Sequence, residues 1–230
     1  VNIIRDYASY LDDEMREING RYGRALSGSK KPVSQRKFAY YLARDVFSQV
    51  AGDYYGKKYF GPEAKADVHQ MVERMVAVYK KRLAKNDWLS KATREKAILK
   101  LDKLGIQVGY PDKIPAVYDQ LKVDEGESLI ANLNQINYVK SREMFGRWNK
   151  PVDRMRWEMS AATVNAYYHP FKNIIVFPAA ILQAPFYSLK QTSSQNYGGI
   201  GAVIAHEISH AFDNNGALFD EYGNLNNWWT

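Results

Sequence analysis

Residues 200–210 read Ile-Gly-Ala-Val-Ile-Ala-His-Glu-Ile-Ser-His, an apolar run that leads into the pattern H-E-x-x-H. On an α-helix, side chains four positions apart lie one above the other, so His206 and His210 can reach one metal ion. Glu207 projects beside the metal, where it can take a proton from a zinc-bound water. Because residues 200–205 are mostly apolar, the helix should lie against a core. The stretch predicts a zinc site on a core-facing helix.

Each part of this site also has an ordinary explanation. The pattern H-E-x-x-H has only three fixed residues, so it arises by chance in some chains of this size. The alternative to a zinc site is therefore two helix histidines beside a solvated Glu207. Asp213 could hold the His210 imidazole by a hydrogen bond, or it could be a helix-terminal carboxylate. A metzincin needs a third histidine six residues after His210, and Gly216 stands there, so that class is excluded. Other candidate ligands, each also explained as a surface or loop residue, are His69, His169, Asp220 and Glu221.

The composition limits the chemistry and the class of protein. The 230 residues include no cysteine, so a metal must be held by histidines and carboxylates, and disulfides are excluded. The net charge of +7 comes mostly from mixed stretches and belongs to no nucleic-acid module, so we expect no nucleic-acid partner. No apolar run is long enough to predict a membrane segment. The chain begins at Val1 and stops directly after two tryptophans, which favours a piece of a longer protein.

Hydrophobic periodicity predicts a mainly α protein with a small β-hairpin or sheet. Val68, Met71, Val72 and Met75 form one of several apolar helical stripes, which we interpret as core. Ser90 is a candidate N-cap. The expected helices cover 3–26, 35–50, 62–84, 90–104 and 127–148, and β-prone runs at 163–168 and 173–177 predict a hairpin.

The change of pattern near Pro151 suggests two regions. Residues 1–150 would form a mostly helical region, and residues 151–230 would start a catalytic zinc lobe. No repeat or low-complexity linker marks the boundary.

Some sixty residues around the zinc helix resemble the neprilysin family, the M13 metallopeptidases, and most of all the bacterial PepO-type endopeptidases. The resemblance begins at Asn165-Ala166-Tyr167-Tyr168 and continues through Ile175 to Tyr187 and Asn196 to Gly201. It then covers the zinc helix, Phe212-Asp213 and the segment from Gly223-Asn224 to Trp228-Trp229.

This resemblance implies a zincin-like (thermolysin-like) catalytic lobe, helical segments of a second lobe, and a zinc metalloprotease that hydrolyses short peptides. His206 and His210 would bind Zn²⁺, and Glu207 would act as general base and then protonate the leaving amine. Asn165 and the Ala166 backbone would bind the peptide as an added strand, although Asn165 could also be a turn residue. The resemblance also implies an apolar pocket for the residue after the scissile bond, lined by Ile181, Phe186 and Val203. Alternatively, these three residues belong to the ordinary core.

The sequence departs from the family pattern in two places. Ala205 replaces a glycine that is more usual there, which a helix accepts. The family takes its third ligand, a glutamate, and its transition-state-stabilising histidine and arginine from later sequence, so we expect them beyond Thr230. The alternative function is a catalytically inactive binding protein on the same scaffold. The lack of cysteine favours a bacterial, cytoplasmic protein, while a secreted or cell-surface location stays open.

Overall fold

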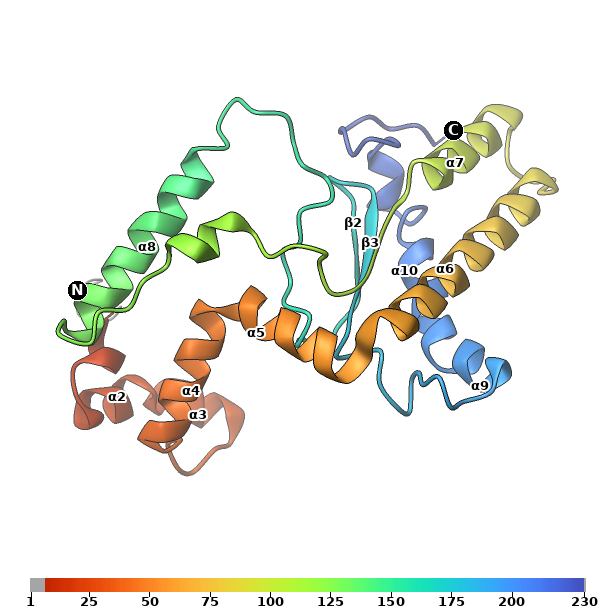
Figure 1. Cartoon of the computed structure of the whole chain (residues 1–230). Coiled ribbons are helices and arrows are strands. Elements are labelled where there is room, and N and C mark those ends of the chain that lie inside the picture. The colour runs from red at the N-terminus through yellow and green to blue at the C-terminus, as the bar shows by residue number, and fades with distance from the viewer. Residues whose placement is uncertain (1–6, 230) are drawn as a thin grey trace. The chain divides into compact units, whose positions relative to one another are not determined.

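A computed structural model describes residues 7–229, which form two compact units (Figure 1). The first unit combines residues 7–48 with 115–151, and the second combines 49–114 with 152–229. Each unit is made of two separate stretches of sequence, because the chain passes from the first unit to the second, back to the first and then to the second again. The expectation of a mainly α protein with a small sheet is confirmed.

The expected division into 1–150 and 151–230 stays a prediction. Its boundary lies next to Pro151, where the first unit ends. The segment 49–114, however, packs with the residues that follow the boundary.

Helices make up the first unit. Asp12 is extended, and its side chain accepts a hydrogen bond of 2.7 Å from the Met15 N–H. A helix therefore begins at Asp13, and a second helix begins after Gly20. The single helix expected over 3–26 is thus wrong for residues 7–26, and residues 3–6 lie outside the described part of the chain. The elements are η1 (Ala8–Tyr10), α2 (Asp13–Asn19), α3 (Arg21–Ser27), α4 (Gln35–Val46), η3 (Ala116–Gln120) and α8 (Leu129–Phe145).

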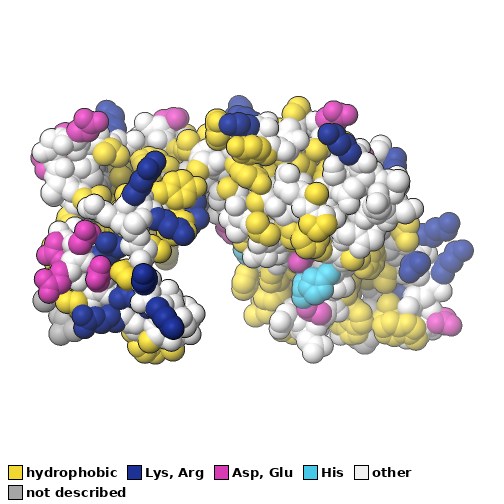
Figure 2. Space-filling model, turned by 90° about the horizontal axis from the view of Figure 1, so that it is seen from below, with side chains coloured by type: hydrophobic (Ala, Val, Ile, Leu, Met, Phe, Trp, Pro, Cys, Tyr) yellow, Lys and Arg dark blue, Asp and Glu magenta, His cyan; other side chains and the backbone are white. Residues whose placement is uncertain are grey.

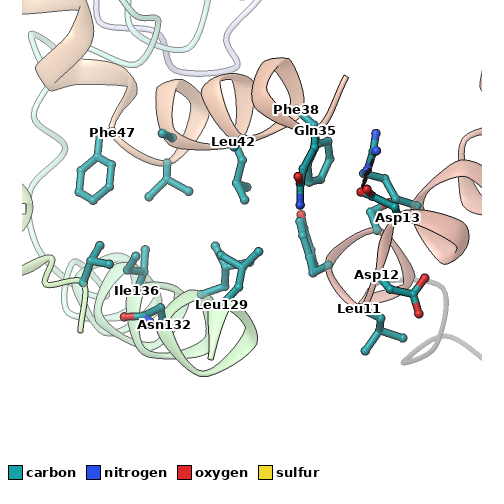
Figure 3. Close-up of a pocket in the computed structure, with 18 residues that line it drawn as sticks. Leu11, Asp12, Asp13, Gln35, Phe38, Leu42, Phe47, Leu129, Asn132 and Ile136 are labelled. Carbon is teal, nitrogen blue, oxygen red and sulfur yellow. Dashed lines mark hydrogen bonds and ion pairs between the residues drawn. The ribbon is translucent and has the colours of Figure 1, made fainter. Parts of the chain in front are cut away.

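Two helices of this unit face each other across an apolar cavity of about 370 Å³. Figure 3 shows Leu42 and Phe47 on the α4 side pointing toward Leu129 and Ile136 of α8. Lys140 of α8 donates a hydrogen bond of 2.6 Å to the Val46 carbonyl at the end of α4. Apolar side chains of both helices therefore line one interior.

The second unit contains the longest described helix and the helix that carries the zinc motif. The expected helix 62–84 is confirmed, and so is the N-cap Ser90, whose side chain accepts from the Thr93 N–H at 3.1 Å. The helix expected over 35–50 is divided at Phe47, where the backbone leaves the helical region. The elements are α5 (Ser48–Tyr55), the π-helical turn η2 (Gly56–Phe60), α6 (Gly61–Ala84), α7 (Lys91–Asp102), α9 (Ser193–Gly198), α10 (Ile200–Ser209) and η4 (Gly216–Leu218).

A three-stranded sheet in the described part of this unit has the order β1-β3-β2. The expected hairpin is confirmed as β2 (Tyr167–His169) paired antiparallel with β3 (Ile174–Pro178), with Tyr168 opposite Ile175. Strand β1 (Gly105–Gly109) is parallel to β3 and was not expected from the sequence. Because β3 is central, all five of its residues are buried, whereas β2 forms an edge.

The core of the second unit fixes the zinc-motif helix in place. Val68 and Val72 of α6 are fully buried together with Ile204 and Ile208 of α10, and Figure 1 shows these two helices beside the sheet. Each such aliphatic side chain stabilises the fold by roughly 1.5–3 kcal/mol. The Tyr79 hydroxyl also donates to the Ala205 carbonyl at 3.0 Å.

None of the described helices combines the length and the apolar character that a membrane span requires. On the face shown in Figure 2, Lys and Arg side chains are spread among acidic, apolar and neutral ones.

Candidate metal centre and substrate edge

Helix α10 brings the two motif histidines together. Isoleucines at positions 200, 204 and 208 bury one face of the helix, which leaves the histidines on another face. The Nε2 atoms of His206 and His210 lie 3.0 Å apart, with ring centroids 4.5 Å apart and rings nearly perpendicular. The two imidazoles thus converge on one point in front of the helix, as the sequence predicts.

A carboxylate orients the second histidine. Oδ2 of Asp213 lies 2.7 Å from Nδ1 of His210. Its Oδ1 accepts from the backbone N–H groups of Asn215 at 2.9 Å and Gly216 at 2.7 Å. Burial raises the pKa of Asp213, but these N–H groups and His210 outweigh it and hold the pKa below the ordinary value. An ionised Asp213 can only accept, so Nδ1 of His210 is the donor, and Nε2 of the neutral imidazole has the lone pair that can bind a metal.

Glu207 is buried beside the histidines, with only 7% of its surface exposed. Burial raises the pKa of this carboxyl above its ordinary value, against the opposing effect of His210 and His206. The backbone N–H of Tyr168 in β2 also donates a hydrogen bond to it. The edge strand therefore supplies one backbone donor to the buried carboxylate.

A cavity of about 440 Å³ joins these groups to the edge of the sheet. Asn165 and Ala166 line it just before β2, together with Tyr168 and Pro170. The expected strand began at residue 163, whereas β2 begins at Tyr167, the first residue that pairs with β3. Just before it, the Asn165 side chain accepts from the Ala166 N–H at 2.8 Å. The remaining lining residues are Tyr167, His206, Glu207, His210, Asp213, Asn215 and Gly216.

The three expected apolar-pocket residues lie outside this cavity. Ile181 belongs to the hydrophobic core, and Val203 packs partly buried against it. Phe186 is 41% exposed. Their role in substrate binding stays a prediction.

The candidate third ligands from within the chain have other partners. His69 lies 3.6 Å from Glu73, and His169 lies 3.6 Å from Glu158. Asp220 caps its own turn through the Tyr222 and Asn224 N–H groups, and Glu221 pairs with a lysine. Within residues 7–229, no three histidine or carboxylate side chains are grouped so that they could hold a metal ion.

The two histidines nevertheless fit zinc. A tetrahedral zinc lies about 2.0–2.1 Å from each imidazole nitrogen, which places two such nitrogens roughly 3.3 Å apart. The observed 3.0 Å is close to that separation. The carboxylate on Nδ1 of His210 is the partner that zinc-binding histidines usually have.

Sequence reasoning missed two residues of the site. Tyr168 contributes a backbone N–H, which no side-chain pattern indicates. Gly216 contributes another, and it was considered only as a missing histidine. Tyr168 reaches the site only because distant segments meet in the fold. Gly216 lies three residues after Asp213, so its contact is local, but a backbone donor leaves no side-chain pattern in the sequence.

Comparisons with known proteins agree with this geometry. Residues 1–111 match the N-terminal model of Peptidase family M13, and residues 165–230 match its peptidase model. A Streptococcus gordonii protein named as a zinc metalloproteinase is 54% identical over all of this chain, which covers 41% of that protein. The neutral endopeptidase of Lactococcus lactis is 54% identical over 99% of the chain, which covers 36% of that enzyme.

Solved structures extend the likeness to the fold. The crystal structure of PepO from Lactobacillus rhamnosis matches the whole chain with a TM-score of 0.93 and 47% identity, over 36% of its own length. The zinc metalloprotease Zmp1 of Mycobacterium tuberculosis, solved with an inhibitor, matches 99% of the chain with a TM-score of 0.88 and 38% identity, over 34% of its length. The chain thus spans well under half of these relatives, and it belongs to Peptidase family M13.

Proposed function

We propose that this chain carries the metal centre and the substrate edge of a zinc endopeptidase that hydrolyses short peptides. The observation that carries the proposal is the convergence of His206 and His210 beside the buried Glu207 in one cavity. Relatives of matching sequence are named neutral endopeptidase and zinc metalloproteinase.

His206 and His210 would hold the zinc ion through their Nε2 atoms. A bound zinc polarises the scissile carbonyl and makes a water molecule more acidic. We place the remaining ligand, and the groups that stabilise the transition state, outside these 230 residues, in keeping with the share of the relatives that the chain spans.

Glu207 would act as the general base. It takes a proton from the attacking water as the water oxygen bonds to the carbonyl carbon, and it passes that proton to the nitrogen when the C–N bond breaks. Its burial supports this role, because a carboxylate with a raised pKa accepts a proton more readily. The Tyr168 N–H would keep the carboxylate directed at the reacting atoms.

The peptide would bind along the edge of β2. This strand has a partner on only one side in the described sheet, so its outer edge can pair with an extended peptide. Asn165 would bind the peptide backbone through its side-chain amide, and Ala166 through its carbonyl. Both lie in the same cavity as the motif residues, which supports the assignment.

The test uses this chain and a chimera in which it replaces the 54% identical segment of the Streptococcus gordonii relative. Zinc content and hydrolysis of a quenched peptide are measured for both, each with and without Glu207→Gln. We expect the chimera to bind about one zinc, and to lose at least about 100-fold in hydrolysis rate with Glu207→Gln while keeping the zinc.

Two results would contradict the proposal. Hydrolysis that persists with Glu207→Gln would remove the general base from the mechanism. A chimera that binds zinc and cleaves none of a varied set of peptides would indicate a binding protein on the same scaffold.

A further inference from the structure

A lysine is buried behind the site, on a helix that the proposed mechanism does not use. Lys100 of α7 is 1% exposed. Its Nζ donates two hydrogen bonds of 2.6 Å, to the carbonyls of Gly216 and Phe219. Both acceptors belong to the turn around η4, which follows directly after Asp213.

This turn connects Lys100 to the metal-binding face. The Gly216 residue whose carbonyl accepts from Lys100 also donates its N–H to Asp213 at 2.7 Å. Asp213 in turn contacts Nδ1 of His210 at 2.7 Å. A continuous series of hydrogen-bonding groups therefore runs from the buried ammonium to the imidazole.

A second set of contacts leads from Lys100 to the substrate edge. The Lys100 carbonyl accepts from the Asn173 side-chain amide at 2.9 Å, and the Asn173 amide oxygen accepts from the Tyr168 hydroxyl at 3.1 Å. The ammonium also lies 5.8 Å from the centre of the Tyr168 ring. Tyr168 is the residue whose N–H donates to Glu207. One lysine thus supports both sides of the cavity.

Burying this charge costs stability. Burial lowers the pKa of Lys100 from 10.5 to about 8, although Asp220, Asp213 and Glu221 oppose the shift. An apolar side chain of similar length would avoid that desolvation, so the interior alone does not call for an ammonium here. The cost is explained if the two carbonyls must be held in fixed positions.

We propose that Lys100 is a positioning residue for His210. It fixes the Gly216–Phe219 turn, the Gly216 N–H of that turn fixes Asp213, and Asp213 fixes the tautomer and the direction of the imidazole. The inference rests on the proposed function, in that His210 is taken as a metal ligand. The tautomer of His210 can nevertheless be measured without any metal.

The experiment compares Lys100→Met with Lys96→Met. Lys96 lies one turn earlier on α7 and pairs at the surface with Glu221 at 3.4 Å, so it is a matched control. NMR correlation spectra of the zinc-free chain, taken where the imidazole is neutral, report which His210 nitrogen carries the proton. Competition titration with a zinc-binding dye reports the affinity of this chain and of the chimera.

We expect wild type and Lys96→Met to hold the proton on Nδ1 of His210, and Lys100→Met to show a mixture of tautomers. Zinc affinity should fall about 10-fold with Lys100→Met, at the lower end of the effects of outer-shell partners. In an Asp213→Asn background, Lys100→Met should cause no further loss, because the lysine acts through that carboxylate. A general loss of structure would instead add to the effect of Asp213→Asn.

The inference is overturned if Lys100→Met leaves both the tautomer and the zinc affinity at wild-type values, or if its loss of affinity adds to that of Asp213→Asn. Should circular dichroism show that Lys100→Met does not fold, Lys100→Arg takes its place, because it keeps donors for the two carbonyls. If Lys100→Arg keeps the wild-type tautomer and zinc affinity, the inference is supported. A loss of zinc affinity in Lys100→Arg as large as that caused by Asp213→Asn would contradict it. A wild-type chain and chimera that bind no zinc would contradict the proposed function, while the tautomer still decides the role of Lys100.

Discussion

At the scale of single residues, the backbone supplies most of the hydrogen-bond partners of two charged groups near the candidate metal centre, the half-exposed Asp213 and the buried Lys100. Asp213 accepts two backbone N–H groups, and Lys100 donates to two backbone carbonyls. Backbone partners are fixed by the fold, so both groups are held without the entropy cost of ordering a second long side chain. This arrangement makes the charge state of each group sensitive to folding.

The pH dependence of stability should reveal the buried lysine. Because its folded pKa of about 8 lies below the ordinary 10.5, the unfolded chain binds more protons between these values, and the free energy of unfolding rises with pH there. Below that range the lysine is charged in both states, and its unfavourable contribution is fully present.

We therefore expect the free energy of unfolding of wild type, minus that of Lys100→Met, to increase by about 1–2 kcal/mol from about pH 7.5 to about pH 9.5. Urea unfolding of both proteins at the two pH values measures the change, with Lys96→Met as the comparison for a surface lysine on the same helix. A constant difference across this range would show that Lys100 keeps its ordinary pKa.

At the scale of elements, local signals predict the helices well and the strands only in part. The apolar stripe and first-turn proline of α6, and the serine cap of α7, act within a few residues, and both helices were expected. Strand β1 depends on pairing with Ile174 to Pro178, far along the chain, and its glycines resemble a turn. The helix expected over 3–26 is broken because the Asp12 side chain competes for a backbone N–H.

The residues of the candidate site likewise include some that local spacing predicts and one that only the tertiary fold brings near. His206, Glu207, His210 and Asp213 lie on one helix and the turn after it, so their spacing alone brings them together. Lys100 comes from another helix, and only the tertiary fold places it near them.

Close packing of η4 against the end of α10 makes a specific prediction. A Cβ at Gly216 would overlap the His210 carbonyl oxygen and would lie 2.6 Å from the Ala211 carbonyl carbon, and both are backbone atoms that cannot move aside easily. We expect Gly216→Ala to lower the free energy of unfolding by at least about 2 kcal/mol.

Gly198→Ala in α9 is the matched control, since a Cβ there meets no atom within 4 Å. It should be neutral or stabilise by up to about 1 kcal/mol, because alanine favours the helix. Denaturant unfolding of both variants measures the difference. Equal stabilities would mean that η4 does not pack against α10 as described.

At the scale of the whole molecule, the residues of the candidate site come from a single compact unit. The cavity lining, Lys100 and the core beneath α10 all belong to residues 49–114 and 152–229. The first unit has its own apolar interior between α4 and α8. A ligand that binds only the folded second unit stabilises the elements that form its site, by an amount that grows with ligand concentration.

Zinc should therefore slow amide hydrogen exchange selectively. We expect saturating zinc to protect α10, β2 and the turn after Asp213, and to leave α4 and α8 unchanged, as measured by mass spectrometry of peptide fragments. At about 100 times its dissociation constant, zinc adds about 2.7 kcal/mol to the stability of the unit that binds it, which corresponds to roughly 100-fold slower exchange through unfolding of that unit. His206→Ala with His210→Ala should abolish the effect, because it removes both nitrogen ligands. Protection that extends equally to α4 and α8 would mean that the two units unfold as one, and protection that survives the double substitution would place the zinc elsewhere.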